Sequence, residues 1–297
     1  MLTTAGFSDR GSPRLLDVPP LKKIPLVAGN GFRSDDVRCT SDHVSWSAPE
    51  PSHHYALVFV RQGCFRRRAD GIETVLDAAS FYVERPGQEQ QIAHPHGRGD
   101  LCTQILLTDE LADELHVDRL LGSREPIFTS PEIDVAHRRF AAGSSDGDEF
   151  VAVDRLRALT SLLPSRSPNA TRDARRRRSV TAASHRRTVD LAREIISRQP
   201  TIPLRELARA VSTSPHHLSR IFHSETGLTI SRYRNRIRVR CVLEKLRDGD
   251  SSLARLSAEL GFTDQAHLCR VFRAELGVPP SSLRPTVAAA ETPAAEP

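Results

Sequence analysis

The stretch Leu-Ser-Arg-Ile-Phe-His-Ser-Glu-Thr-Gly-Leu at residues 218–228 is repeated 50 residues later as Leu-Cys-Arg-Val-Phe-Arg-Ala-Glu-Leu-Gly-Val at residues 268–278. Both copies keep the pattern Leu-x-Arg-[Ile/Val]-Phe-x-x-Glu-x-Gly-[Leu/Val]. Upstream of the first copy, the small residue Ala208 is matched at an offset of 49 by Ser257. Two copies are too few for a solenoid, so the repeat predicts a duplicated supersecondary unit.

The first copy has the spacing of a helix-turn-helix unit. Leu204, Leu207 and Val211 recur at helical spacing and predict the buried face of the first helix. After a short turn, Ser214 is the expected N-cap of the second helix. Pro215 suits the first helical position because its φ angle is already fixed near the helical value.

The second copy repeats this organisation. Gly261 supplies the backbone freedom that the turn requires, and Thr263 or Asp264 is the expected N-cap of the helix that follows. The second helices of the two units are therefore predicted at about residues 214–223 and 263–273. A bundle with a chance repeat is the alternative, and the double match of spacing argues against it.

The second copy also carries a family signature. Residues 261–272 read Gly-Phe-x-x-Gln-x-His-Leu-x-Arg-x-Phe, and residues 277–284 read Gly-x-Pro-Pro-x-x-Leu-Arg. This pattern resembles the signature of AraC/XylS-type transcription regulators, and the resemblance covers roughly residues 186–285. It implies an all-α DNA-binding domain in which two recognition helices, joined by a long helix, enter consecutive major grooves about 34 Å apart.

The resemblance implies base contacts from outward-facing side chains of both recognition helices. These are His216, Ser219 and Arg220 in the first unit and Gln265, His267 and Arg270 in the second. Two alternatives stay open for the arginines. They could contact phosphates, which position a protein without specifying sequence, or form structural salt bridges with Glu225 and Glu275.

Charge is distributed unevenly along the chain. Residues 171–284 hold 23 Arg and Lys against 11 Asp and Glu, whereas the rest holds 19 against 26. This asymmetry indicates a polyanionic partner for the C-terminal part. Within it, possible phosphate contacts are Arg236, on the long helix, and the run Arg175, Arg176, Arg177 and Arg178, in a predicted exposed basic linker at 164–185.

Composition excludes several classes of protein. No apolar run approaches the roughly 20 residues of a membrane span, and no secretory signal is apparent at the N-terminus. The five cysteines are odd in number and widely spaced, which favours a reducing cytoplasm over a disulfide framework. No catalytic Ser-His-Asp set, P-loop or Rossmann fingerprint is present, so we expect a protein that is not an enzyme.

The N-terminal half predicts short strands. Residues 1–30 are expected to be an extended or disordered lead-in, and residues 31–108 to hold strands separated by Gly and Pro turns, including a hairpin at Asp70-Gly71. Many short strands with such turns suggest a small β-barrel or a sandwich. Their order resembles the cupin-like sensor domain of many AraC-type regulators, which favours the small β-barrel. Helices predicted at 109–163 would complete this domain, either covering the barrel or supplying a dimer surface.

Several soft or borderline metal ligands fall in this half, among them Cys39, His94 and Cys102. Their spacing matches no tight zinc motif, and no carboxylate follows His94-x-His96 to complete the usual cupin arrangement. Buried cysteines and loop histidines are common without a metal, so the pattern favours no cofactor and no metal. A redox-sensing thiol is a third interpretation.

The sequence therefore predicts an α+β chain of two domains. A cupin-like sensor or dimerisation domain at 31–163 precedes the double helix-turn-helix domain at 186–285, and 286–297 form a disordered tail. We expect a sequence-specific transcription regulator with double-stranded DNA, a small-molecule effector and RNA polymerase as partners, and a second copy of the chain in a homodimer. The alternative is a cupin-type metalloenzyme with an accessory helical domain.

Overall fold

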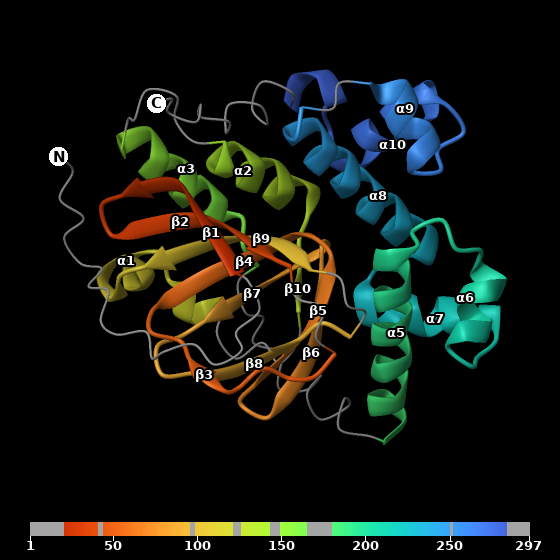
Figure 1. Cartoon of the computed structure of the whole chain (residues 1–297), viewed down its shortest axis with the longest axis horizontal. Coiled ribbons are helices and arrows are strands. Elements are labelled where there is room, and N and C mark those ends of the chain that lie inside the picture. The colour runs from red at the N-terminus through yellow and green to blue at the C-terminus, as the bar shows by residue number, and fades with distance from the viewer. Residues whose placement is uncertain are drawn as a thin grey trace.

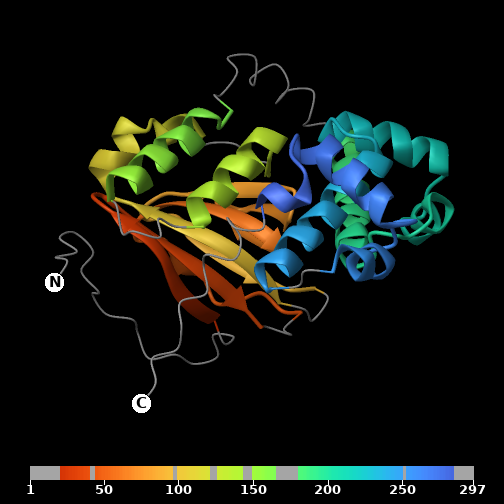
Figure 2. The same ribbon diagram turned by 90° about the horizontal axis from the view of Figure 1, so that it is seen from above.

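The computed structural model describes residues 21–40, 44–95, 99–120, 126–142, 149–164, 180–249 and 252–283. Antiparallel strands and the helices that cover one of their sheets form an N-terminal domain, and an all-helical C-terminal domain lies beside it (Figures 1 and 2). The predicted run Arg175–Arg178 and the tail at 286–297 lie outside the described residues. The fold is mixed α and β, as the sequence predicts.

The strands of the N-terminal domain form two antiparallel sheets. A six-stranded sheet has the order β1-β2-β9-β4-β7-β10 and a four-stranded sheet the order β3-β8-β5-β6. The strands are β1 (Leu21–Gly29), β2 (Phe32–Cys39), β3 (Glu50–Pro51), β4 (Tyr55–Gln62), β5 (Cys64–Ala69), β6 (Ile72–Asp77), β7 (Ser80–Glu84), β8 (Glu89–Ala93), β9 (Asp100–Leu107) and β10 (Ile127–Phe128). Within the described residues the two sheets stay separate, so no closed sheet confirms the predicted small β-barrel.

Alternating side chains assign the two faces of the six-stranded sheet to two cores. Leu57 and Phe59 of β4 pack under helices, whereas Val58 and Val60 face the four-stranded sheet and meet Phe65. This is the period of two expected of a strand that is covered on both faces. The space between the two sheets is therefore lined by strands that are distant in sequence.

Helices α1 (Asp109–Glu114), α2 (Pro131–Ala141) and α3 (Glu149–Ser161) cover the outer face of the six-stranded sheet (Figure 2). A short 3-10 helix, Val117–Leu120, follows α1. Phe140 of α2 is 1 % exposed and packs on Phe32 of β2. The helices thus have the covering role that the sequence left open, and a dimer surface stays a prediction.

Strand β1 lies where the sequence predicts an extended or disordered lead-in. Leu21–Gly29 pair with β2 along the edge of the six-stranded sheet, so the domain begins before residue 31. Pro25 removes a hydrogen-bond donor, and the register shifts between Pro25 and Val27. Proline is tolerated at edges and bulges, which explains how a proline-containing segment still joins the sheet.

The C-terminal domain consists of α5 (Val180–Arg198), α6 (Leu204–Ala210), α7 (Pro215–Thr226), α8 (Ile230–Arg247), α9 (Leu253–Glu259) and α10 (Gln265–Leu276). Helix α5 begins inside the segment that the sequence assigns to the linker. Helix α8 joins the α6–α7 unit to the α9–α10 unit, and each unit has its own apolar core. The first core also takes in Ala78 and Ala79 from the N-terminal domain, so the two domains share buried surface.

Candidate nucleic-acid interface

The first helix-turn-helix unit has the local geometry that its sequence predicts. The side chain of Ser214 caps α7 by accepting a hydrogen bond from the backbone N–H of His217 at 3.2 Å, and Pro215 lies in the first turn. In the turn before the cap, Ser212 has a φ of 54°, where the second unit has Gly261 at 71°. Ser212 therefore holds a conformation that ordinarily favours glycine.

In the second unit, Asp264 is the cap of α10. Its carboxylate accepts a hydrogen bond from the backbone N–H of His267 at 2.6 Å, which decides between Thr263 and Asp264. Gly261 is needed here for space as well as for its φ, because a Cβ at this position would lie 2.3 Å from the Thr201 side chain. The turn of the second unit thus fits closely against the loop between α5 and α6.

The inner face of each recognition helix is fully buried. Leu218 and Phe222 of α7, like Leu268 and Phe272 of α10, are 0 % exposed. Ala208 lies in the same core at 1 % exposure. This packing orients the opposite face of each helix toward solvent, and the same repeat positions are outward in both units.

The six side chains predicted to contact bases lie on these outward faces. Four are exposed and two are half-buried: His216, Arg220, Gln265 and Arg270 are exposed, and Ser219 and His267 are half-buried. The structure thus presents three of them from α7 and three from α10. An exposed polar face on a helix of this diameter is what the major groove admits.

The two half-buried side chains already use hydrogen-bonding groups within their own unit. The Ser219 hydroxyl donates to the carbonyl oxygen of Pro215 at 2.9 Å. His267 Nδ1 accepts the backbone N–H of Thr263 at 3.2 Å. Because Nδ1 is the acceptor, the neutral ring carries its proton on Nε2, which can donate to a ligand.

The sequence allowed Arg220 and Arg270 to form salt bridges with Glu225 and Glu275. The structure shows no such pair among the residues it describes. In the described part of the chain both glutamates have other partners, since Glu225 lies 4.0 Å from Arg186 and Glu275 lies 3.6 Å from Arg232. Arg220 instead contacts His217 Nδ1 at 3.1 Å. The arginine of each repeat therefore remains available to a ligand.

Arg236, a possible phosphate contact by sequence, faces the N-terminal domain in this structure. Its side chain is 6 % exposed, and one terminal nitrogen donates to the carbonyl oxygen of Thr129 in the N-terminal domain at 2.8 Å. Burial lowers the pKa of Arg236, and neighbouring Arg240 lowers it further. The alternation of arginines in the sequence does not reveal which of them face the other domain. The contact with Thr129 shows that Arg236 does.

Helix α8 carries arginines on two opposite faces. Arg236 and Arg240 face the N-terminal domain. At 3.6 residues per turn, Arg234 and Arg238 lie about half a turn away. Arg238 donates to the carbonyl oxygen of Leu260 at 2.8 Å, whereas the Nε of Arg234 has no hydrogen-bond partner among the described residues. Arg234 is thus a cation of α8 that sequence reasoning did not single out.

One buried polar cluster joins the domains through α5. Asp77, at the end of β6, is 0 % exposed and accepts a hydrogen bond from Arg193 Nε at 3.0 Å. Arg193 Nε also lies 3.0 Å from the Tyr233 hydroxyl, which donates to the same carboxylate. Burial alone would lower the pKa of Arg193, but Asp77, Tyr233 and Asp190 raise it, so the guanidinium stays charged.

A second cluster joins the domains through α8. Asp36 of β2 pairs with Arg61 of β4 and, at 3.2 Å, with Arg247 of α8. Glu244 of α8 in turn pairs with Arg138 of α2. Opposite charges therefore meet across the interface, and each domain supplies both an acid and an arginine to these pairs.

A pocket of about 620 Å³ lies between the two sheets. Val58 and Tyr82 line it from the six-stranded sheet, and Phe65 and Ile92 line it from the four-stranded sheet. Glu84 adds a buried carboxylate to this mostly apolar wall. A concave, apolar site of this size with few polar groups is typical of small-molecule binding.

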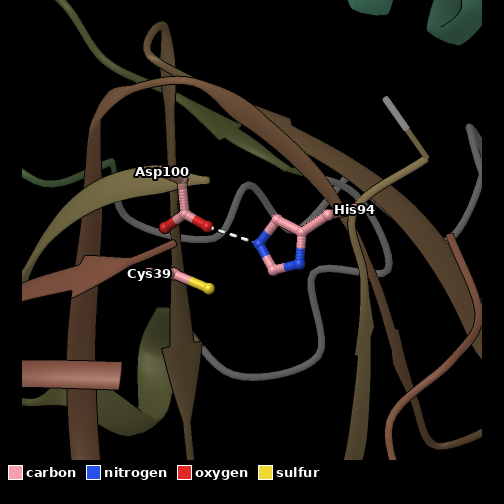
Figure 3. A group of neighbouring side chains, drawn as sticks. All are labelled: Cys39, His94 and Asp100. Atoms are coloured by element: carbon pink, nitrogen blue, oxygen red, sulfur yellow. Dashed lines mark hydrogen bonds and ion pairs between the residues drawn. The ribbon is translucent and has the colours of Figure 1, made fainter. Parts of the chain in front are cut away.

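At one end of this pocket the structure brings together residues that the sequence named separately. Cys39 ends β2, His94 follows β8, and Asp100 opens β9; their ligating atoms lie within 4.8 Å of one another (Figure 3). His94 Nε2 lies 2.6 Å from an oxygen of Asp100, and Cys102 Sγ donates to the other oxygen at 3.1 Å. Asp100 was missed by sequence reasoning, although it lies only six residues after His94.

The ionisation of this cluster follows from its burial and its hydrogen bonds. Burial alone would lower the pKa of His94, but hydrogen bonds to Asp100 and Cys39 raise it to about 9. Burial raises the pKa of Cys102 well above its ordinary value, and the negative charge of Asp100 raises it further. In the absence of a ligand, His94 and Asp100 therefore form an ion pair beside neutral Cys102.

Among the described residues, no helix is both long enough and apolar enough to cross a membrane.

The two-unit arrangement defines a double helix-turn-helix domain of the kind found in DNA-binding proteins. Comparison with known families agrees, because residues 207–286 match the family described as a helix-turn-helix domain. This C-terminal domain is of the AraC type.

Two relatives illustrate the similarity. The chain is 32 % identical over 81 residues to the regulatory protein PocR of Salmonella typhimurium, which is 27 % of each protein. It is 35 % identical over 79 residues to the transcriptional activator RhaS of Klebsiella pneumoniae, which is 27 % of this chain and 28 % of RhaS. The chain thus spans about a quarter of the length of these relatives.

Among solved structures, ToxT from Vibrio cholerae O395 aligns over 87 % of this chain and 99 % of its own, with 11 % identity and a TM-score of 0.34. That superposition is too loose to bear on function.

Proposed function

We propose that this protein is a sequence-specific transcription regulator that inserts α7 and α10 into consecutive major grooves of double-stranded DNA. The observation that carries the proposal is the pair of outward polar faces at matching repeat positions, each backed by a fully buried apolar face. Because α8 is continuous from Ile230 to Arg247, it holds the two recognition helices at one separation, and a monomer can read two half-sites.

The outward side chains of α7 and α10 are the proposed base readers, and the half-buried Arg234 of α8 is a proposed phosphate contact. Arg220 and Arg270 can each donate two hydrogen bonds to guanine O6 and N7, and Gln265 can pair with adenine N6 and N7. His216 and His267 add further donors. Arg234, which faces away from the N-terminal domain and lacks an acidic partner in the described residues, replaces Arg236 as the candidate phosphate contact on α8.

The N-terminal domain would act as a cupin-like sensor whose pocket receives an effector, and would not catalyse a reaction. Its signal would reach DNA through α8, since Asp36, Arg138 and Thr129 of this domain contact arginines and a glutamate of that helix. RNA polymerase and a second copy of the chain are the further partners that we propose for such a regulator.

The experiment selects binding sites from a random DNA pool with the purified full chain, and then measures affinity as salt is raised. We expect one enriched motif and an affinity that falls steeply with salt, because counterions are released from phosphates. The double variant Arg220→Ala/Arg270→Ala should lose the motif. Its matched control, Arg119→Ala/Arg139→Ala, removes the same charge from exposed positions of the N-terminal domain and should keep it.

Absence of an enriched motif, or equal loss in the two double variants, would contradict the proposal. The first result would mean that the chain does not read sequence. The second would mean that net charge, and not the placement of the two arginines on the recognition helices, governs the binding.

A further inference from the structure

The cluster of Cys39, His94 and Asp100 has the chemistry and the placement of a metal site. Cys39 and Asp100 are paired opposite each other in the ladder between β2 and β9, and His94 reaches them from the other sheet. Their exposed fractions are 7 %, 4 % and 7 %. Figure 3 shows the imidazole, the carboxylate and the sulfur directed toward a common centre.

We propose that this cluster binds one Zn²⁺-class divalent ion through Cys39 Sγ, His94 Nε2 and one carboxylate oxygen of Asp100. Zinc lies about 2.0–2.3 Å from such ligands, so tetrahedral ligand atoms are roughly 3.3–3.8 Å apart. The three ligand atoms already lie within 4.8 Å of one another, and small side-chain rotations that open the 2.6 Å contact between His94 and Asp100 give this spacing. A thiolate and an imidazole select zinc over magnesium or calcium, which prefer oxygen ligands.

The surroundings of the cluster support a built site. Cys102 Sγ donates to Asp100 Oδ1 at 3.1 Å, which leaves the Oδ2 atom directed at His94. An outer partner of this kind orients a ligating carboxylate in metal sites. The backbone is also packed tightly here, because a Cβ on Gly99 would lie 1.7 Å from the carbonyl oxygen of Cys39. This contact sets the spacing between two of the three ligands.

Three protein ligands leave a tetrahedral ion with one open position. Cys39, His94 and Asp100 all line the pocket of about 620 Å³ between the sheets. The open position therefore faces a space large enough for a small molecule, and an oxygen or nitrogen of that molecule can complete the coordination. The ion would replace the proton that His94 and Asp100 share and would be held by Cys39 as a thiolate.

The test is a titration of the metal-depleted full chain with Zn²⁺, and separately with Co²⁺ as a spectroscopic probe. We expect one ion per chain, and for Co²⁺ a thiolate charge-transfer absorption together with the visible bands of a tetrahedral ion. Cys39→Ser and Asp100→Asn should each weaken binding by more than the roughly 10–100-fold that changes to outer partners cost. Cys39→Ser should also abolish the charge-transfer absorption.

Cys64→Ser is the matched control, because Cys64 is buried in the same domain at 8 % exposure and lies outside the cluster. It should keep the stoichiometry, affinity and spectrum of the parent. Circular dichroism of the metal-free proteins shows whether each variant is folded, and Asp100→Asn supplies a nearly isosteric second variant. Binding that survives both ligand changes, or a parent that takes up no ion, overturns the proposal. The titration measures metal uptake alone, so its result does not depend on whether the chain binds DNA.

Discussion

Asp77 of the N-terminal domain and Arg193 of the C-terminal domain form an ion pair at 3.0 Å in which neither side chain is more than 1 % exposed. A desolvated charge that loses its partner is costly, and breaking a buried pair typically costs about 3–5 kcal/mol. The pair therefore makes each domain contribute to the stability of the other.

Replacing Arg193 with Met should lower the free energy of unfolding by about 3–5 kcal/mol, because the Asp77 carboxylate would stay buried without its cation. Urea unfolding can be followed by fluorescence of Trp46, the only tryptophan and a residue of the N-terminal domain, and by circular dichroism of the helices. We expect the two transitions to coincide in the parent and to separate in Arg193→Met.

Arg187→Met provides the control for that measurement, since Arg187 is exposed on the same helix. It should leave both transitions unchanged. Adding Asp77→Asn to Arg193→Met should recover part of the loss, because the second change removes the unpaired charge. Coincident, unshifted transitions in Arg193→Met would show that the pair does not couple the domains.

Ala208→Leu should disable the first helix-turn-helix unit. Ala208 is 1 % exposed, and overpacking a filled core costs about 1–3 kcal/mol. Ala210→Leu makes the same substitution two residues later on the same helix at an exposed position and should have little effect. Thermal unfolding compares them. Equal melting temperatures would mean that no close helix crossing exists at residue 208.

Arg270→Ala should cost about 1–3 kcal/mol on the selected DNA site and relax preference at one base pair. Arg273→Ala removes the same charge from an exposed position of α10 near its C-terminal end and should weaken all DNA sequences alike. Selection from a random pool with each variant separates these effects. Unchanged base preference in Arg270→Ala would remove this residue from the base-reading set.

His137 should make stability depend on pH. Burial lowers the pKa of His137 well below 6.5, and nearby Arg138, Arg61 and Arg240 lower it further. Below about pH 6.5 the unfolded chain binds a proton that the folded protein excludes, so the free energy of unfolding falls as pH falls, by up to about 1.4 kcal/mol per pH unit. The ring stacks on Phe59 at 4.5 Å.

His137→Phe keeps an aromatic ring against Phe59 and removes the titration. As pH falls from 7.5 to 5, the free energy of unfolding should therefore fall more in the parent than in this variant. His116→Phe, at an exposed position of the same domain, serves as the control and should show no such shift. A constant difference between His137→Phe and the parent across this range would show that the buried ring is not held neutral.

The helix-turn-helix units could be predicted closely because their signals are local. The cap at Ser214, the proline that follows it and the glycine at 261 each act within a few residues, and the structure agrees at all three. The hairpin at Asp70-Gly71 is a similar case, with φ of 50° and 73° at the two residues. Turns and helix caps can be predicted from the local sequence without knowing which residues pack against them.

Contacts between distant parts of the chain could not be predicted in this way. Arg236 was assigned to DNA because it is basic, but its burial depends on Thr129, which lies 107 residues earlier. Asp100 joins His94 and Cys39 only once two sheets are placed face to face. Strand β1 was missed because its proline argues locally against a strand, and only pairing with β2 reveals the edge position.

The docking of arginines from α5 and α8 onto acidic groups of the other domain bears on how such regulators can be recombined. A foreign sensor domain fused ahead of this DNA-binding domain would have to supply acids in register with Arg193, Arg240 and Arg247, which pair here with Asp77, Asp134 and Asp36. Without these acids, the guanidinium groups would be buried without an anionic partner. The stability of chimeric regulators should therefore depend on matched charges at this surface, and not on the length of the linker between the domains.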